Sequence, residues 1–180
     1  MTTNKARTDL WMDLALVAFL VALDVVARLL PHAPGFLPVA ASGLFAARVL
    51  RIPALAIVVP VLAMILSDVG LPGEDWRIQA VGFAAIAIPA VAGIATRRWG
   101  GILPTAATVV VSSILFFVLS NAAVWAFSGM YQATLAGLTE CYVLAVPFLE
   151  KTMMGDLFWA GVLFGGAWLV QRTPTLVRAR

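Results

Sequence analysis

Long apolar runs, separated by short polar or proline-containing connectors, dominate the chain. A helix needs about 20 mainly apolar residues, within a range of roughly 17–25, to cross the hydrocarbon core of a bilayer. Run length and the positions of proline, glycine and charge together predict six membrane-spanning helices. We place them at about residues 10–30, 36–50, 54–69, 78–95, 102–127 and 152–170.

The second and third runs are shorter than a usual crossing, so they form either one kinked helix or two short helices packed within the bundle. Arg48, Arg51 and Pro53 lie between them. An arginine in the middle of a membrane helix costs about 2.5–3.5 kcal/mol on insertion scales. We therefore expect two separate helices whose connector reaches a membrane surface.

The stretch between the fifth and sixth runs, residues 128–151, is too apolar for a solvated loop. Its apolar side chains recur at roughly helical spacing, at Leu135, Leu138, Tyr142, Val143 and Val146. We predict an interfacial or re-entrant helix at about residues 131–147, which Pro147 ends and which lies over the outer end of the bundle.

Composition favours a membrane protein, because 62% of the residues are hydrophobic and only 12% are charged. Soluble domains usually carry about 25% charged residues. The first apolar run is longer than the apolar part of a secretory signal peptide, which has roughly 7–15 residues, so we predict that it is retained. The predicted fold class is one all-α, polytopic membrane domain over residues 1–180. Its single cysteine, Cys141, excludes an intrachain disulfide.

The basic residues follow the positive-inside rule if both termini are cytoplasmic. Nine of the twelve lysines and arginines then lie on the cytoplasmic side: Lys5, Arg7, Arg48, Arg51, Arg97, Arg98, Arg172, Arg178 and Arg180. The outer side holds the other three basic residues and most of the acids: Arg28, Arg77, Lys151, Asp68, Glu74, Asp75, Glu140, Glu150 and Asp156. Because the basic residues are spread over short connectors, the net charge of +3 predicts no nucleic-acid binding.

Catalytic and metal-binding motifs are absent from the sequence. A single histidine, His32, excludes a two-histidine metal site, and no G-x-S-x-G, H-E-x-x-H or Walker A motif occurs. We predict that the protein is not an enzyme and uses no metal ion or cofactor.

The connector RLLPHAPGFLPV, residues 28–39, contains more proline and glycine residues than a simple turn needs. Its three prolines stiffen the backbone, and Gly35 permits a tight turn. Asp24 and Arg28 lie four residues apart on one helix face, so they either pair with each other or leave Arg28 to bind an anionic ligand group. We predict that Arg28 and His32 belong to the rim of an outer pocket, closed by residues 128–151 and by the outer ends of the third, fifth and sixth helices.

Other polar residues join this predicted site, and each also has a structural explanation. Asp68 closes the third helix, and Asp156 opens the sixth, where an acid stabilises the helix dipole. Asn121 and Trp125 lie one turn apart, where helix packing and interface anchoring are equally expected. Glu140 is an acid in an otherwise apolar segment, so its side chain must face water, a partner or a ligand. The candidate ligand-binding residues are Arg28, His32, Asp68, Asn121, Trp125, Glu140, Tyr142 and Asp156.

Three stretches carry a resemblance to known proteins: ARLLPHAPGFLPVAASGLFAARVL, LAMILSD and YQATLAGLTECYVLAVPFLEKTMMGDLFWAGVLFG. From Val26 to Ala167 the chain resembles a family of uncharacterised bacterial membrane proteins labelled as transport proteins. That family is distantly similar to the substrate-binding S components of energy-coupling-factor (ECF) vitamin transporters. The second resemblance rests on size, six spans, inside termini, a Pro-x-Phe-x-Pro-Val connector and Ala18-x-x-x-Ala22 in the first helix.

The resemblance implies a multi-pass protein of the bacterial cytoplasmic (inner) membrane that binds a vitamin-like or metal-containing small molecule from outside. It also implies a membrane coupling protein and ATPase subunits as partners, with Ala18 and Ala22 facing the coupling protein. The alternative is a structural or accessory subunit of a larger membrane complex, which has no ligand of its own and uses its alanine-rich faces for packing.

Overall fold

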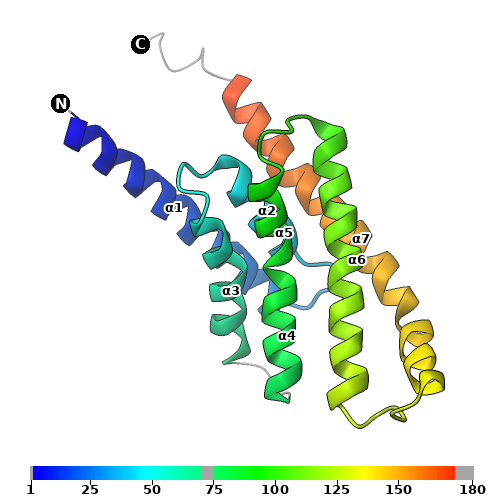
Figure 1. The fold of residues 1–180 in the computed structure, drawn as a ribbon. Coiled ribbons are helices and arrows are strands. Elements are labelled where there is room, and N and C mark those ends of the chain that lie inside the picture. Colours follow the sequence, from blue (N-terminus) through cyan, green and yellow to red (C-terminus); the bar gives the residue numbers. More distant parts are fainter. Residues whose placement is uncertain (1, 70–74, 173–180) are drawn as a thin grey trace.

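Helices make up most of the residues that the structure describes, which are 2–69 and 75–172, with side chains from Arg7 onwards. In this computed structural model they are α1 (Thr2–Leu29), α2 (Val39–Val49), α3 (Leu55–Asp68), α4 (Trp76–Ile86), α5 (Ile88–Ala95), α6 (Ile102–Phe127) and α7 (Leu135–Arg172) (Figure 1). No strand occurs within these ranges. Four predicted positions lie outside the described part: Glu74, Arg178, Arg180 and the side chain of Lys5.

Four segments are long and apolar enough to cross a membrane: Arg7–Leu29, Trp76–Ala95, α6 and α7. The predicted class of all-α membrane protein is therefore confirmed. α2 and α3 have only 11 and 14 residues. At about 1.5 Å per residue, neither spans a hydrocarbon core about 30 Å thick. The count of six complete crossings, with both termini inside, stays a prediction.

The helix boundaries follow the sequence pattern closely in most places. α6 begins and ends where predicted, and the second and third runs form two helices rather than one kinked helix. The fourth predicted span is interrupted at Ala87, because α4 ends before this residue and α5 begins after it. Pro89 explains the break, since its ring cannot donate a backbone hydrogen bond and crowds the preceding turn.

The largest difference concerns α7, a single helix of 38 residues. Pro147 lies inside it, so the prediction that this proline ends a separate helix is wrong. The helix instead changes direction along its length (Figure 1), as helices that continue past a proline commonly do. At about 1.5 Å per residue α7 is longer than a membrane core is thick. An interfacial position for residues 131–147 stays a prediction.

α2 forms the centre of the bundle, where it packs against α1, α3, α5 and α7. Eight of its 11 residues are buried, which explains why the helix is apolar on nearly every side. Small residues allow close approach: a Cβ on Gly93 of α5 would lie 2.7 Å from the Cβ of Ala47. Ala18 and Ala22 are exposed on α1 and face away from this core.

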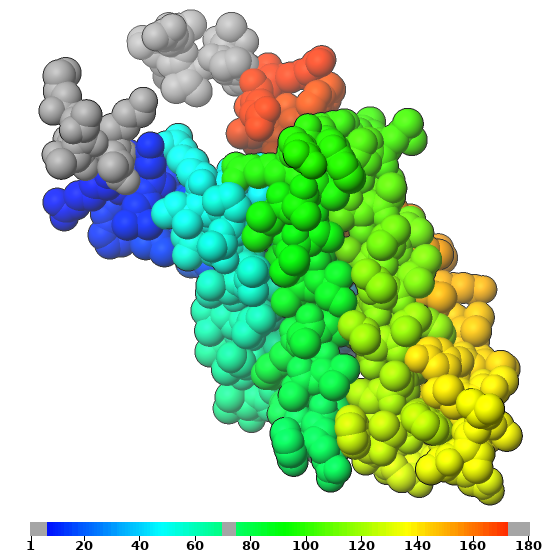
Figure 2. Space-filling view, viewed as in Figure 1, coloured from blue at the N-terminus to red at the C-terminus, as the bar shows by residue number. Residues whose placement is uncertain are grey.

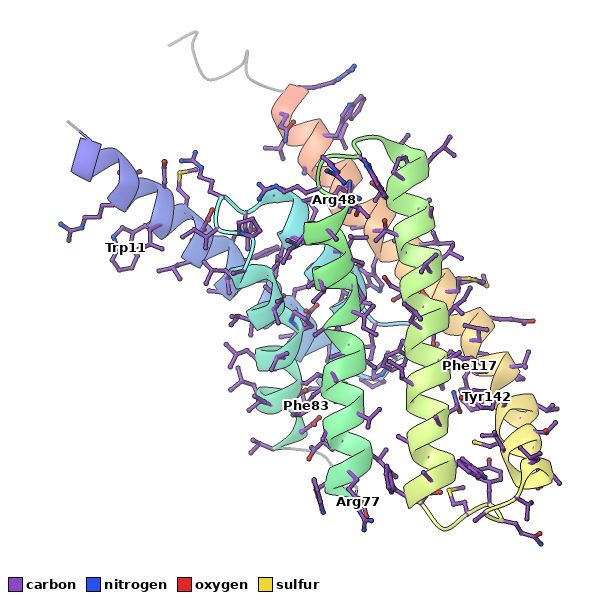
Figure 3. All side chains as sticks on the ribbon, viewed as in Figure 1. Trp11, Arg48, Arg77, Phe83, Phe117 and Tyr142 are labelled. Atoms are coloured by element: carbon purple, nitrogen blue, oxygen red, sulfur yellow. The ribbon has the colours of Figure 1, made fainter. Side chains whose placement is uncertain are left out.

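The two ends of the bundle differ in their basic residues, and Arg48 and Arg77 lie at opposite ends (Figure 3). At the Arg48 end, arginines bind backbone carbonyls. Arg48 Nη1 donates to Trp99 O at 2.9 Å, and Arg97 Nη2 donates to Leu50 O at 2.7 Å. Trp99 lies in the connector after α5, whereas Leu50 is the C-cap of α2, where a helix leaves its carbonyls free. The N-terminal part of α1 projects from the body beside this end (Figures 1 and 2).

Candidate functional site

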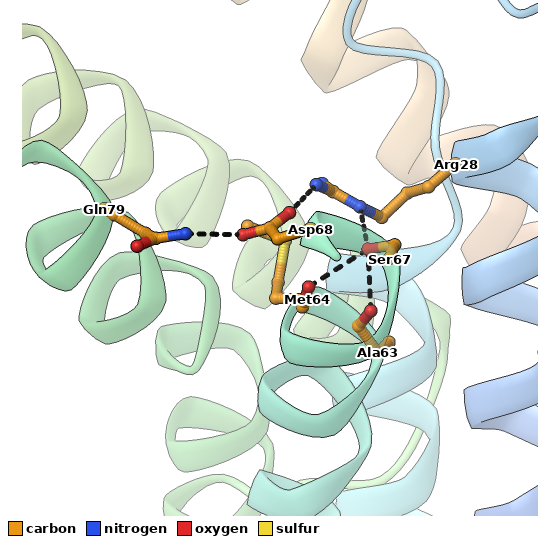
Figure 4. Close-up of polar contacts among 6 residues, drawn as sticks. All are labelled: Arg28, Ala63, Met64, Ser67, Asp68 and Gln79. Atoms are coloured by element: carbon orange, nitrogen blue, oxygen red, sulfur yellow. Dashed lines mark hydrogen bonds and ion pairs between the residues drawn. The ribbon is translucent and has the colours of Figure 1, made fainter. Parts of the chain in front are cut away.

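Asp68 at the end of α3 joins three helices (Figure 4). Its Oδ1 accepts a hydrogen bond from Arg28 Nη2 at 2.6 Å, and its Oδ2 accepts one from Gln79 Nε2 at 3.0 Å. Arg28 Nε also donates to Ser67 Oγ at 2.6 Å. The ion pair is largely shielded, since the side chains of Arg28 and Asp68 are 14% and 20% exposed. The ends of α1, α3 and α4 are thus tied together by a satisfied network.

Asp24 and Arg28 form no ion pair in the described part of the chain, so the alternative in which they pair with each other is wrong. Spacing within α1 puts both residues on one face, but this face contacts two different helices, α2 at Asp24 and α3 at Arg28. Asp24 is fully buried against α2, where its Oδ1 accepts a hydrogen bond from Ser42 Oγ at 2.8 Å. The longer Arg28 side chain reaches the end of α3 instead.

Asp156 lies in the middle of α7 rather than in the first turn of a helix, because the helix begins at Leu135. The predicted stabilisation by a helix N-terminus is therefore wrong for this residue. Its side chain is 4% exposed, and Oδ2 accepts a hydrogen bond from Ser113 Oγ of α6 at 2.7 Å. Asp156 thus faces a neighbouring helix within the bundle.

A cavity of about 410 Å³ lies between these groups. Its wall comes from the end of α1, the connector after it, and all six of the other helices, α2 to α7. The polar lining residues are Arg28, Asp68, Gln79, Ser112, Ser113, Ser120, Thr152 and Asp156. The apolar lining includes Leu37, Met64, Ile78, Ile86, Phe116 and Val124. Small-molecule sites typically have volumes of roughly 300–1,000 Å³ and combine an apolar wall with a few convergent polar groups.

Over residues 8–177 the chain matches a family described as a family of unknown function (DUF6580). The chain belongs to this family. No curated protein matches it, and no solved structure does. The matched region of this DUF6580 member includes every residue that lines the cavity.

Ser112 supplies the cavity with an unused hydrogen-bonding group. Its side chain is 2% exposed, and its Oγ has no hydrogen-bond partner. Leaving a buried hydroxyl unsatisfied costs about 1–3 kcal/mol. Ser112 lines the cavity but its Oγ is itself shielded, so a molecule held there can supply the missing bond once the Ser112 side chain changes rotamer. Within the described ranges of this DUF6580 member, no three His, Cys, Asp or Glu side chains gather to hold a metal ion.

The proline-rich connector forms one wall of the cavity through Gly35 and Leu37. Two glycines let it lie directly on α7. Gly35 has a φ of +78°, and a Cβ there would lie 2.5 Å from Thr152 Oγ1. A Cβ on Gly155 would lie 2.9 Å from the Cα of Phe36. The connector therefore supports the part of α7 that carries Asp156.

The other predicted residues lie outside this cavity. His32 and Glu140 are exposed, and His32 Nδ1 contacts Leu30 O at 2.7 Å. Trp125 Nε1 donates to Gln132 O at 3.0 Å, while Tyr142 Oη donates to Val118 O at 2.7 Å. These two bonds fasten α7 and the loop before it to α6.

Asn121 also makes a local bond, donating from Nδ2 to Phe117 O at 2.8 Å. It lines a smaller cavity of about 200 Å³ between α6 and α7, together with Phe148 and Leu149. No residue of the predicted closing segment 128–151 lines the larger cavity, although Thr152 directly after it does.

Sequence reasoning missed Gln79, Ser112 and Ser113 and the contribution of α4. Two adjacent serines in the middle of an apolar span were a usable indication, since polar groups at membrane depth commonly mark a binding site or a helix contact. Gln79 gave no comparable indication, because only the fold brings α4 beside Asp68.

Proposed function

We propose that this protein binds a small molecule in the cavity and takes part in its uptake, as an S-component-like subunit of a bacterial membrane transporter. The observation that carries the proposal is the cavity of about 410 Å³ itself, with an Arg28–Asp68 pair, Asp156 and the unpartnered Ser112 hydroxyl in its wall. Polar groups from several helices converge there although the rest of the bundle interior is mainly apolar.

The cost of burying charged side chains favours a ligand-binding role for these residues over a role in helix packing alone. Charged side chains within membrane helices are costly, and they persist where they pair or face a polar cavity. Packing alone requires no open space beside them. An unpartnered buried hydroxyl is unfavourable in an empty protein, and a ligand that bonds to it recovers this cost.

The proposed orientation puts the cavity in the outer half of the bacterial cytoplasmic membrane. Arg48 lies at the end opposite Arg77 (Figure 3). Arg97 bonds to Leu50, close to Arg48 in the chain, whereas the Arg28–Asp68 pair bonds to Gln79, two residues from Arg77. The positive-inside rule assigns the arginine-rich end to the cytoplasm. The ligand then enters from outside.

Active uptake needs partners, because the sequence contains no ATP-binding motif. We propose a membrane coupling protein with ATPase subunits, as the resemblance to ECF S components implies. The exposed Ala18 and Ala22 give α1 a small-residue face on which another helix can pack closely.

The same alanine face also supports the second candidate function, an accessory subunit of a larger membrane complex without its own ligand. This function needs the α1 surface but not the cavity. The two candidates therefore differ in whether the cavity is occupied by a specific molecule.

Native mass spectrometry of the gently purified protein tests the proposal. A reproducible added mass that is not lipid, lost on unfolding, supports a binding subunit and gives the substrate class. A bare protein, or one that carries only lipid after growth in rich medium, contradicts the binding function and favours the accessory subunit. Co-purifying proteins would then be identified from the same preparation.

A further inference from the structure

The two acids of the cavity differ in how their charge is balanced. Asp68 pairs with Arg28 through one oxygen and with Gln79 through the other. Arg28 in turn uses its Nη2 on Asp68 and its Nε on Ser67. Arg28, which is the only basic residue among the described residues that line the cavity, is thus already paired with an acid, and both oxygens of Asp68 are occupied.

Asp156 has no such balance. Its Oδ2 accepts a bond from the neutral Ser113 hydroxyl, and in the described part of the chain no basic side chain forms an ion pair with it. Among the described residues, the charged side chains that line the cavity are those of Arg28, Asp68 and Asp156, which are two acids and one base. A buried carboxylate without a cation is costly, and a cation that enters the cavity removes much of this cost.

Ser112 lies beside Asp156. Besides lining the main cavity together, the two residues line a narrow crevice between α2, α5, α6 and α7, with Ala41 and Val109. The Ser112 hydroxyl has no partner and can accept a hydrogen bond. A carboxylate and a hydroxyl acceptor side by side match a group with several N–H donors, such as an ammonium or an amidinium.

We infer that the ligand carries a compact organic cation, which Asp156 and Ser112 bind, on an apolar body that packs against Phe116, Met64 and Ile86. This inference rests on the proposed binding function and names the ligand class. It disfavours a carboxylate or phosphate ligand, because an anion would have to displace Asp68 from Arg28 and would lie beside the Asp156 carboxyl group, which forms no ion pair in the described part of the chain.

Three probes of nearly equal size test the charge preference on the full chain purified in detergent. They are benzylammonium, benzyl alcohol and benzoate, which share one aromatic body and differ in the charge of the head group. Binding is measured by isothermal titration calorimetry and by the shift in thermal unfolding. We expect benzylammonium to bind about 10-fold or more tightly than benzyl alcohol, and benzoate to bind more weakly still.

Two matched variants then test whether Asp156 is the residue that binds the cationic group. Asp156→Asn keeps the shape and can still bond Ser113, but it removes the negative charge. Asp24→Asn makes the same change at a buried acid that does not line the cavity. We expect Asp156→Asn to weaken benzylammonium binding about 10-fold or more and to leave benzyl alcohol unchanged, whereas Asp24→Asn leaves both within about 2-fold.

The outcomes separate this inference from the proposed function. Preference for benzoate, equal affinities for the alcohol and the cation, or unchanged cation binding in Asp156→Asn would overturn the cationic class while leaving a binding function intact. Failure of all three probes, together with the absence of a co-purifying small molecule, would overturn both. If Asp156→Asn does not fold, the three affinities of the unaltered chain still decide the charge preference.

Discussion

Two buried aspartate–serine pairs lie in different parts of the bundle and differ in what surrounds them. Asp24 of α1 accepts a bond from Ser42 of α2 at 2.8 Å, and Asp156 of α7 accepts one from Ser113 of α6 at 2.7 Å. The two acids are 0% and 4% exposed. Chemistry, distance and burial are therefore nearly the same.

The difference lies in the space beside each pair. Asp24 is enclosed by the interface of α1 with α2, whereas Asp156 faces a cavity that Ser112 also lines. A buried acid in a membrane bundle can therefore either hold two helices together or form part of a ligand site. The residue type does not show which of these roles applies, whereas a cavity and unpartnered polar groups beside the acid do.

Removing the serine should affect the two pairs differently. In Ser42→Ala, Asp24 loses the hydrogen bond to its Oδ1 while its Oδ2 is already without a partner, so we expect a loss of about 2–3 kcal/mol in the free energy of unfolding. In Ser113→Ala, water in the cavity can replace the lost bond, and we expect a loss of about 1 kcal/mol. Denaturant titration in mixed micelles measures both. Equal losses would contradict the distinction.

Substitution of Gly155 should disturb only the pair that faces the cavity. A Cβ there would lie 2.9 Å from the Cα of Phe36, so Gly155→Ala pushes the connector away from α7. We expect a loss of about 1–3 kcal/mol from overpacking, with weaker binding of any cavity ligand. Gly161→Ala is the control on the same helix, because nothing lies within 4 Å of the added atom. A similar loss in both variants would mean that the helix, rather than the connector contact, responds.

Some of this arrangement could be predicted from the sequence and some could not, for physical reasons. The bounds of α6 follow from an uninterrupted apolar run, and Arg48 to Pro53 separate α2 from α3 through the cost of buried charge. The partner of Arg28 could not be predicted, because spacing along α1 cannot show which neighbouring helix each side chain meets. Pro147 was misjudged because a long helix can bend at a proline without ending.

The Arg28–Asp68 pair should contribute more to stability than an exposed pair of the same kind. Arg28→Ala leaves Asp68 with only Gln79 as its partner, and we expect a loss of about 1–2 kcal/mol after allowance for partial exposure of the pair. Arg77→Ala breaks an ion pair with Asp75 in which Arg77 is 50% exposed, so its loss should be about 0–1 kcal/mol. Thermal unfolding measures the loss of stability in each variant. A larger loss for Arg77→Ala would contradict the conclusion that the Arg28–Asp68 pair contributes more to stability.

The smallest effects are expected at His32 and Glu140, which the sequence pattern placed in the site. Both side chains are exposed, and neither lines the cavity. His32→Ala and Glu140→Ala should therefore leave both thermal unfolding and benzylammonium affinity unchanged within error. Benzylammonium titration of both variants beside Asp156→Asn makes the comparison direct. A loss of affinity in Glu140→Ala would mean that the segment before Thr152 closes over the cavity when it is occupied, which would restore the predicted outer cover and extend the site beyond Asp156.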